Sequence, residues 1–171
     1  MPASPFALVP AAYVLLLRDG PNGAQVLLQR RSNTGFMDDH WAASAAGHVE
    51  PGESCTAAAL RETREELGVE VTEADLEALC AVHRYQQTDR PVDQRVDFFF
   101  RCRRWTGEPA LREPKASALD WYDVAALPDP VVPHELAVLR GLAGGSLPPV
   151  SSFGFSGLDS GVTGVARTDP G

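Results

Sequence analysis

Residues 47–69, GHVEPGESCTAAALRETREELGV, are the most informative stretch of this chain, because a helical pattern begins and ends inside it. Ser54 stands at the expected start, and Gly68 follows Leu67, where glycine commonly ends a helix. At about 100° per residue, acidic residues gather on one face, so we expect the helix to bury its Leu/Thr side and to display carboxylates. The acidic face holds Glu62, Glu65 and Glu66, and the opposite face holds Thr56, Leu60, Thr63 and Leu67.

Carboxylates this close on one helix repel one another, at a cost of a few tenths of a kcal/mol per pair. Arg61 and Arg64 are near enough to offset part of that repulsion. One interpretation is therefore a solvated acidic face with arginine partners. The other is a site for a hard cation such as Mg²⁺, which prefers oxygen ligands. Glycines within residues 47–52 would let the preceding loop bend closely around such a site, and Glu53 extends the acidic region.

The same stretch resembles the signature of the Nudix hydrolase family, in particular of its MutT-like bacterial members that act on nucleotides. That signature is Gly, five residues, Glu, seven residues, Arg-Glu, an apolar residue, any residue, Glu-Glu, any residue, Gly and an apolar residue. Thr63 takes one apolar position and should lie on the buried face, away from any metal. The other eight of the nine defined positions match, and they are Gly47, Glu53, Arg61, Glu62, Glu65, Glu66, Gly68 and Val69.

The resemblance extends beyond the signature, over about residues 6–142. NTGFMD at 33–38 and TrpTyr at 121–122 are similar to segments of the nucleotide-type members. Two departures stand out. Ala45 occupies a place where the family often has Pro, and Lys115 directly follows a Glu-Pro pair that in the family is often Glu-Pro-x-Lys.

The resemblance implies a Mg²⁺- or Mn²⁺-dependent hydrolase, in which water attacks a phosphorus of a nucleoside diphosphate derivative. A nucleoside triphosphate or modified nucleotide is the first expectation. ADP-ribose, another nucleotide sugar or a dinucleotide is the alternative, and a ligand-sensing module without turnover is a third interpretation. In catalysis it implies Glu53 as base or further ligand, Arg61 as the residue that holds the glutamates through ion pairs, and Glu65 as the group that orients water. The implied metal ligands are Glu62, Glu65, Glu66 and the backbone carbonyl of Ala46.

A carboxylate from outside the signature often completes such sites in the family, and Asp97 and Glu113 are the candidates here. Asp97 lies on a strand of alternating character, between Val96 and Phe98, so it could instead be a solvent-facing strand residue. Glu113 could equally be an ordinary loop charge.

Phe36 and Tyr85 are candidates for stacking on a base, although aromatic residues at such places more often belong to a core. His48 is a candidate for a phosphate contact. Arginines on the strands could also hold phosphates, but alternating arginines on a strand typically face solvent. These are Arg84, Arg95, Arg101 and Arg103.

The remaining pattern predicts an α/β fold of the α+β type, with a mixed β-sheet sandwiched between helices. We expect a Nudix domain over residues 1–143 and a disordered tail over 144–171, where Gly, Ser and Pro dominate and charge is sparse. Strands are predicted at 11–18, 25–30, 41–46, 76–85, 95–105 and 119–122, and a second helix at 133–142.

Composition excludes several classes of partner. Of 171 residues, 23 are acidic and 15 basic, and the net charge of -8 opposes binding of polymeric nucleic acid. A small phosphorylated ligand remains compatible, because a metal ion can reverse the local sign. The longest apolar run is too short to cross a bilayer, and Cys55, Cys80 and Cys102 fit no zinc spacing. We therefore expect a cytoplasmic protein with reduced thiols, with no membrane partner and with a homodimer left open.

Overall fold

A computed structural model describes residues 5–86, 90 and 93–155. Its sheet of eight strands has the order β3-β2-β1-β6-β5-β8, with β4 also paired to β1 and β7 to β2. The strands are β1 (Val9–Gly20), β2 (Gly23–Arg31), β3 (Trp41–Ala43), β4 (Ala45–His48), β5 (Leu76–Tyr85), β6 (Gln94–Cys102), β7 (Ala116–Asp123) and β8 (Val150–Phe153). The helices are α1 (Cys55–Leu67), the short 3-10 helix η1 (Glu73–Asp75) and α2 (Pro133–Gly144).

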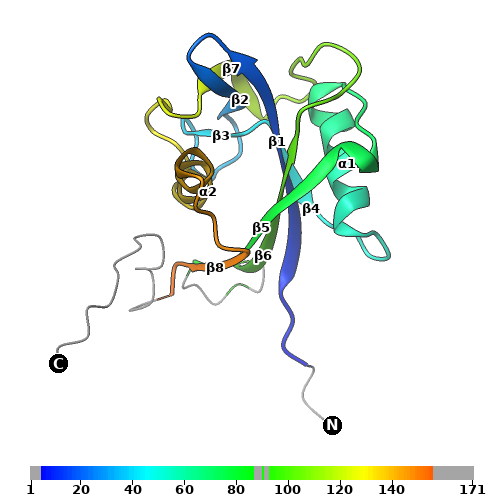
Figure 1. The fold of residues 1–171 in the computed structure, drawn as a ribbon. Helices are drawn as coiled ribbons and strands as arrows, with labels where there is room; N and C mark the ends of the chain where they lie inside the picture. The colour runs from blue at the N-terminus through cyan, green and yellow to red at the C-terminus, as the bar shows by residue number, and fades with distance from the viewer. Residues whose placement is uncertain (1–4, 87–89, 91–92, 156–171) are drawn as a thin grey trace, which may run out of the picture.

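Strand β1 is central because it carries apolar side chains on both faces. Tyr13, Leu15 and Leu17 pack into one core cluster with residues of α2. Val14 and Leu16 pack into a second cluster with residues of α1. Figure 1 shows α1 and α2 on opposite sides of the sheet, which confirms the predicted sandwich. A strand covered on both faces reads as a continuous apolar run, which is the pattern seen from residue 11 to residue 17.

Helix α1 begins and ends where the sequence predicts. The Ser54 hydroxyl accepts a hydrogen bond from the Ala57 N–H at 3.0 Å. Gly68 ends the helix in the left-handed region, with φ of 70°, and its N–H donates to the Arg64 carbonyl. The prediction of a fully displayed acidic face is wrong, however, because Glu62 and Glu66 are buried while Glu65 is exposed. The helix packs its glutamate side toward β4, as the site geometry below explains.

Two predicted strands differ from the structure. The expected strand at 41–46 is two strands, since β3 pairs with β2 and β4 pairs with β1. Strand β6 is not half-buried, because it lies between β1 and β5 with side chains of both faces covered. Asp97 is consequently fully buried and not solvent-facing.

The predicted disorder from residue 144 onward is wrong for the first part of that segment. Strand β8 runs parallel to β5, with Ala81 opposite Val150 and Arg84 opposite Phe153. Phe153 also packs against the core cluster on the α2 side, so one aromatic side chain anchors a segment of low charge and poor periodicity. Residues 156–171 lie outside the described residues, and their disorder stays a prediction. Among the described residues no helix has the length and apolar character needed to cross a membrane.

Candidate active site

The loop that leads into α1 lies against the helix's glutamates. The Ala46 N–H donates to Glu66 Oε2 at 2.9 Å, which ties β4 to the last turn of α1. At Gly47 the approach is closer still, since a Cβ there would overlap the Glu62 carboxylate. A glycine is favoured at this position because a side chain there would displace the Glu62 carboxylate. The signature glycine and its glutamates are thus one packing unit.

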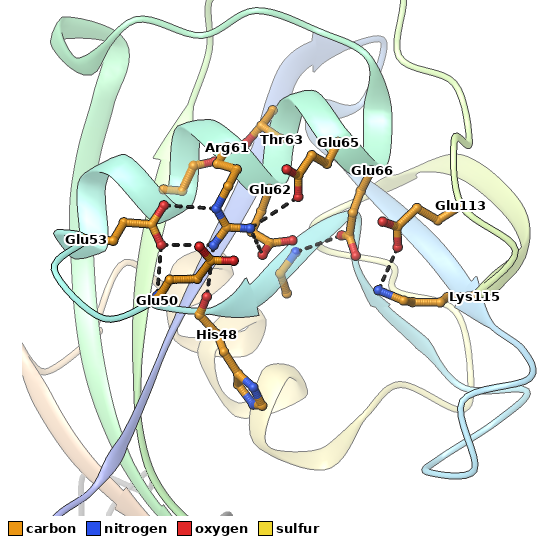
Figure 2. A network of polar contacts seen from close by, with 12 residues as sticks. His48, Glu50, Glu53, Arg61, Glu62, Thr63, Glu65, Glu66, Glu113 and Lys115 are labelled. Carbon is orange, nitrogen blue, oxygen red and sulfur yellow. Dashed lines mark hydrogen bonds and ion pairs between the residues drawn. The ribbon is translucent and has the colours of Figure 1, made fainter.

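Arg61 organises the carboxylates of α1 (Figure 2). Its Nε and Nη2 donate to the two oxygens of Glu53, at 2.9 and 3.0 Å, in a forked ion pair. Its Nη1 donates to Glu62 at 2.5 Å and to Glu65 at 3.2 Å. Its Nη2 also donates to the His48 carbonyl at 3.0 Å, so the arginine joins the loop to the helix.

The carboxylates differ in their electrostatic environments. Hydrogen bonds from Arg61 lower the pKa of Glu53 to about 2, so Glu53 is ionised and fully engaged. Burial raises the pKa of Glu66 to about 7, and burial also raises the pKa of Glu62. Two of the predicted metal ligands are therefore buried acids whose ionised forms lack sufficient nearby positive charge.

A hard divalent cation fits this donor set chemically. Carboxylate oxygens of Glu62, Glu65 and Glu66 and a backbone carbonyl at Ala46 are the ligand types that Mg²⁺ prefers. A cation would also offset the burial that raises the pKa values of Glu62 and Glu66. Within residues 5–86, 90 and 93–155, no three His, Cys, Asp or Glu side chains converge as a formed metal site. The carboxylates instead meet Arg61 and the Ala46 N–H.

Glu113 and Lys115 lie beside Glu66 on the far side from Arg61 (Figure 2). The Lys115 ammonium is 2.6 Å from Glu113 Oε2. Its positive charge lowers the pKa of both Glu62 and Glu66, against the larger effect of burial. The structure thus brings Glu113, a carboxylate from outside the signature, next to the signature residues.

A cleft of about 330 Å³ opens from these glutamates across the sheet. Phe36 and His48 line it, and Phe36 is 37% exposed. Burial and Arg95 lower the pKa of His48, so its imidazole is neutral at pH 7. Tyr85 is not among the described residues that line the cleft, since its ring packs beside Phe155 at 5.6 Å between centroids. The predicted stacking role therefore gains geometric support for Phe36 and loses it for Tyr85.

A second polar cluster, called the wall below, lines the same cleft with Arg84, Arg95, His134 and Glu135. Arg84 Nε donates to Asp97 Oδ2 at 2.7 Å, with both side chains almost fully buried. Asp97 is therefore beneath the wall, bound to an arginine, and the prediction of a solvated strand arginine is wrong at residue 84. His134 and Glu135, from the first turn of α2, complete the wall. Pro at the helix start was a visible signal for α2, but no pattern distinguished Glu135 from an ordinary first-turn acid.

Substituting Gly47 by alanine tests the packing of β4 on α1. The added methyl overlaps the end of the flexible Glu62 side chain, so we expect the carboxylate to move while the fold persists. Metal affinity and turnover should fall about 10- to 100-fold, the scale for displacing a group that supports a metal site. Mg²⁺ titration by calorimetry and a thermal melt would measure both. Gly144→Ala is the matched control, because its methyl meets open space. Equal metal affinity in the two variants would contradict the expectation.

The family model described as NUDIX domain matches residues 7–142. A MutT NUDIX hydrolase from Burkholderia pseudomallei superposes with a TM-score of 0.68 at 24% identity, over 78% of this chain and 97% of that chain. The NUDIX domain of Shewanella oneidensis NrtR, solved with ADP ribose, gives 0.65 at 19% identity, over 84% and 92%. A C. elegans Ap4A hydrolase gives 0.57 at 20% identity, over 78% and 96%. A search of curated proteins found no match.

Proposed function

Because the chain belongs to the Nudix family of hydrolases that act on nucleoside diphosphate derivatives, we propose that it is a Mg²⁺-dependent pyrophosphohydrolase of a nucleoside triphosphate or modified nucleotide. The observation that carries this proposal is the pair of buried carboxylates, Glu62 and Glu66, at one end of a cleft of about 330 Å³. Such a cleft is large enough for a small ligand to lie with its phosphates at the acidic end.

Glu62, Glu66 and the Ala46 carbonyl would hold a divalent cation, with Glu65 as a further ligand. When bound, that cation supplies charge neutralisation at the phosphates and a lowered pKa for water. Glu53 has both oxygens committed to Arg61, so we assign it to holding that arginine in place. Glu65 is about half exposed and accepts only the longer 3.2 Å contact from Arg61. We therefore assign Glu65 to orienting the attacking water.

The charges around the cleft suit a phosphorylated substrate. Arg31 and Lys115 both line it, Lys115 beside Glu66 and Glu113, and can meet phosphate oxygens as hydrogen-bond donors. His48 also lines the cleft as a neutral imidazole and can donate to a phosphate from its N–H. Positioning and electrostatics supply most of the rate in phosphoryl transfer, so a rigid helix bearing the carboxylates suits the task.

A nucleotide sugar is the second candidate substrate. The Shewanella domain that shares this fold was solved with ADP ribose, at 84% coverage of the present chain. A ligand-sensing module is the third, since the fold alone does not require turnover. The partner in each case is a small nucleotide, and a cytoplasmic location is part of the same proposal.

A screen of phosphate, pyrophosphate and nucleoside monophosphate release tests the function directly. The panel holds nucleoside triphosphates, nucleotide sugars and dinucleotides, each with Mg²⁺ and with EDTA. We expect turnover of nucleoside triphosphates that EDTA abolishes, because the glutamates cannot neutralise phosphate charge by themselves. Binding of nucleotides without turnover of any panel member would overturn the hydrolase and favour the sensing module. Turnover confined to nucleotide sugars would overturn the substrate class alone.

A further inference from the structure

The cleft that Glu62 and Glu66 line also has a wall of charged side chains to which the proposed hydrolysis assigns no role. Arg84 and Arg95 come from β5 and β6, and Asp97 lies between them. Asp97 Oδ2 accepts from Arg84 Nε at 2.7 Å, and its Oδ1 is 3.8 Å from Arg95 Nε. Asp97 thus positions the two guanidinium groups, and both of them line the cleft.

Arg95 has hydrogen-bonding capacity to spare. Its Nε is buried and has no hydrogen-bond partner among the described residues. Its side chain is 18% exposed and its pairing with Asp97 is long, in contrast to the tight pair that Arg84 makes. Asp97 Oδ1, which is also buried without a hydrogen-bond partner, faces this Nε at 3.8 Å. The part of the guanidinium left for a ligand is therefore the exposed part of the side chain, which lines the cleft.

Glu135 supplies the opposite kind of group on the same wall. Its Oε2 accepts a short hydrogen bond from the Ala43 N–H, which fixes the carboxyl between α2 and β3. The carboxyl lines the cleft, and burial leaves it 3% exposed. Its second oxygen, Oε1, is 3.9 Å from His134 Nε2, beyond hydrogen-bonding distance. The wall therefore offers guanidinium donors beside a carboxylate acceptor.

We propose that this wall, made of Arg84, Arg95 and Glu135, recognises the edge of a nucleobase on which two adjacent acceptors are followed by a donor, so that the substrate is a guanine or cytosine nucleotide. The proposal rests on the proposed function, which puts the phosphates at Glu62 and Glu66 and leaves the base to this wall of the same cleft. It names the specificity residues and the substrate class within that function.

The order of hydrogen-bond acceptors and donors along each base decides which bases fit the wall. A guanidinium binds two adjacent acceptors in a fork, as it does with guanine O6 and N7, and a carboxylate accepts from an amine such as cytosine N4. Guanine runs N7, O6, then N1–H, and cytosine runs O2, N3, then N4–H, so both present acceptor, acceptor, donor. Adenine and uracil alternate acceptor, donor, acceptor, and would leave one buried group of the wall unpaired.

An anion suits the wall less well than a base does. Asp97 and Glu135 place two carboxyl groups beside the two guanidinium groups, so a second phosphate there would face carboxylate oxygens as well as donors. The exposed ring of Phe36 lies on the same cleft and offers a stacking surface. Its carbonyl accepts from Arg31 Nε and from Thr34 Oγ1, both at 2.9 Å, so the loop that carries the ring is held in place.

Binding of nucleoside monophosphates tests the inference without depending on turnover, because these ligands have no phosphoanhydride bond. Equilibrium dialysis with GMP, CMP, AMP and UMP should show GMP and CMP bound about tenfold or more tightly than AMP and UMP, the scale of a forked arginine contact. Inosine monophosphate lacks only the guanine 2-amine and keeps N7, O6 and N1–H, so it should bind about as tightly as GMP. Equal binding of all four monophosphates would overturn the inference.

Two variants test whether the wall causes the preference for GMP and CMP. Glu135→Gln keeps an oxygen for the Ala43 N–H but turns an amide donor toward the base, so GMP and CMP affinity should fall about tenfold while AMP and UMP affinity stays unchanged. Arg95→Lys keeps the charge and loses the fork, with the same expected selectivity. Glu77→Gln and Arg103→Lys, in exposed ion pairs elsewhere, are the controls. Circular dichroism melts establish that each variant is folded.

The possible outcomes separate this inference from the proposed function. Preferential GMP and CMP binding, lost in both wall variants, would support the inference even in a protein that hydrolyses nothing. Hydrolysis of the four nucleoside triphosphates at equal kcat/KM would overturn the inference and leave the hydrolase intact. Competition by inorganic phosphate that is lost in Arg95→Lys would show an anion site at the wall and would overturn it as well.

Discussion

Glu66→Gln is expected to lower kcat/KM for the preferred nucleotide by about 10²- to 10³-fold, the scale of losing one preorganised charge at a transition state. Glutamine keeps an oxygen that can accept from the Ala46 N–H, now at 2.9 Å, so the link between β4 and α1 should survive. What it loses is the anionic oxygen that faces a cation. The measurement is steady-state kinetics with Mg²⁺, together with calorimetric titration of Mg²⁺ into each protein.

The thermal stability of the same variant should be kept or raised, although its activity falls. Burial raises the pKa of Glu66 from 4.5 to about 7, so the folded chain binds more protons at this site than the unfolded chain between those values. The contribution of Glu66 to stability therefore falls as pH rises through that window, and is lowest above pH 7. Glutamine does not titrate. At pH 8 without metal, the variant should melt at the same temperature as the original protein or higher.

Glu70→Gln is the matched control, because Glu70 is an exposed partner of Arg64 on the outside of the molecule. That variant should keep both activity and metal affinity. An unchanged Mg²⁺ affinity in Glu66→Gln would remove Glu66 from the metal ligands. A large fall in melting temperature at pH 8 would mean that the carboxylate supports the fold and would contradict the electrostatic argument.

Arg61→Lys should lower kcat by about 10²-fold or more, although the charge is retained, because lysine cannot reproduce the fork to Glu53 or reach the other carboxylates at the same time. Without those hydrogen bonds, Glu62 and Glu65 repel each other and lose their fixed orientation. The pKa of Glu53 should rise from about 2 toward its usual value, since hydrogen bonds from Arg61 are the main cause of its depression. Carboxylate titration by NMR would measure that change.

Arg64→Lys provides the comparison, because Arg64 lies on the same helix but makes an exposed ion pair with Glu70 at 3.0 Å. Its activity should stay within a factor of two or so, as expected for exposed pairs of small energetic value. If Arg61→Lys retained full kcat, the arginine would be a surface residue of the helix and the assignment of a positioning role to it would fail. A rise in KM alone, with kcat unchanged, would instead point to a role in substrate binding.

The sequence was sufficient for the elements that carry strong local signals. Ser54 and Gly68 marked the ends of α1, and the apolar run of β1 marked a buried strand, because caps and hydrophobic patterning act over a few residues. The spacing of the signature also brought Glu53, Arg61 and Glu65 together, since one helix with its preceding loop contains them all. The relative placement of residues on a single helix and the loop before it could therefore be predicted from the sequence.

The remainder depends on contacts between distant segments, which local patterns do not encode. Glu66 is buried because β4 donates an N–H to it, and β4 was not distinguished from β3 in the sequence. Arg84 and Asp97 are buried as a pair across β5 and β6, whereas each strand by itself looked half solvated. Glu135 reaches the cleft only because α2 packs on the opposite side of the sheet from α1.

Strand β8 has a consequence for how the chain acquires its shape. It covers the outer edge of β5 through a parallel pairing of residues more than sixty positions apart, Ala81 with Val150. Parallel pairs of this kind form late, since loop closure opposes them until both segments exist. During synthesis the backbone groups of β5 therefore stay open to other strands until residues 150–153 emerge, and a nascent chain paused before that point presents a template for aggregation. Part of the segment that the sequence predicts to be a disordered tail therefore protects the sheet against aggregation.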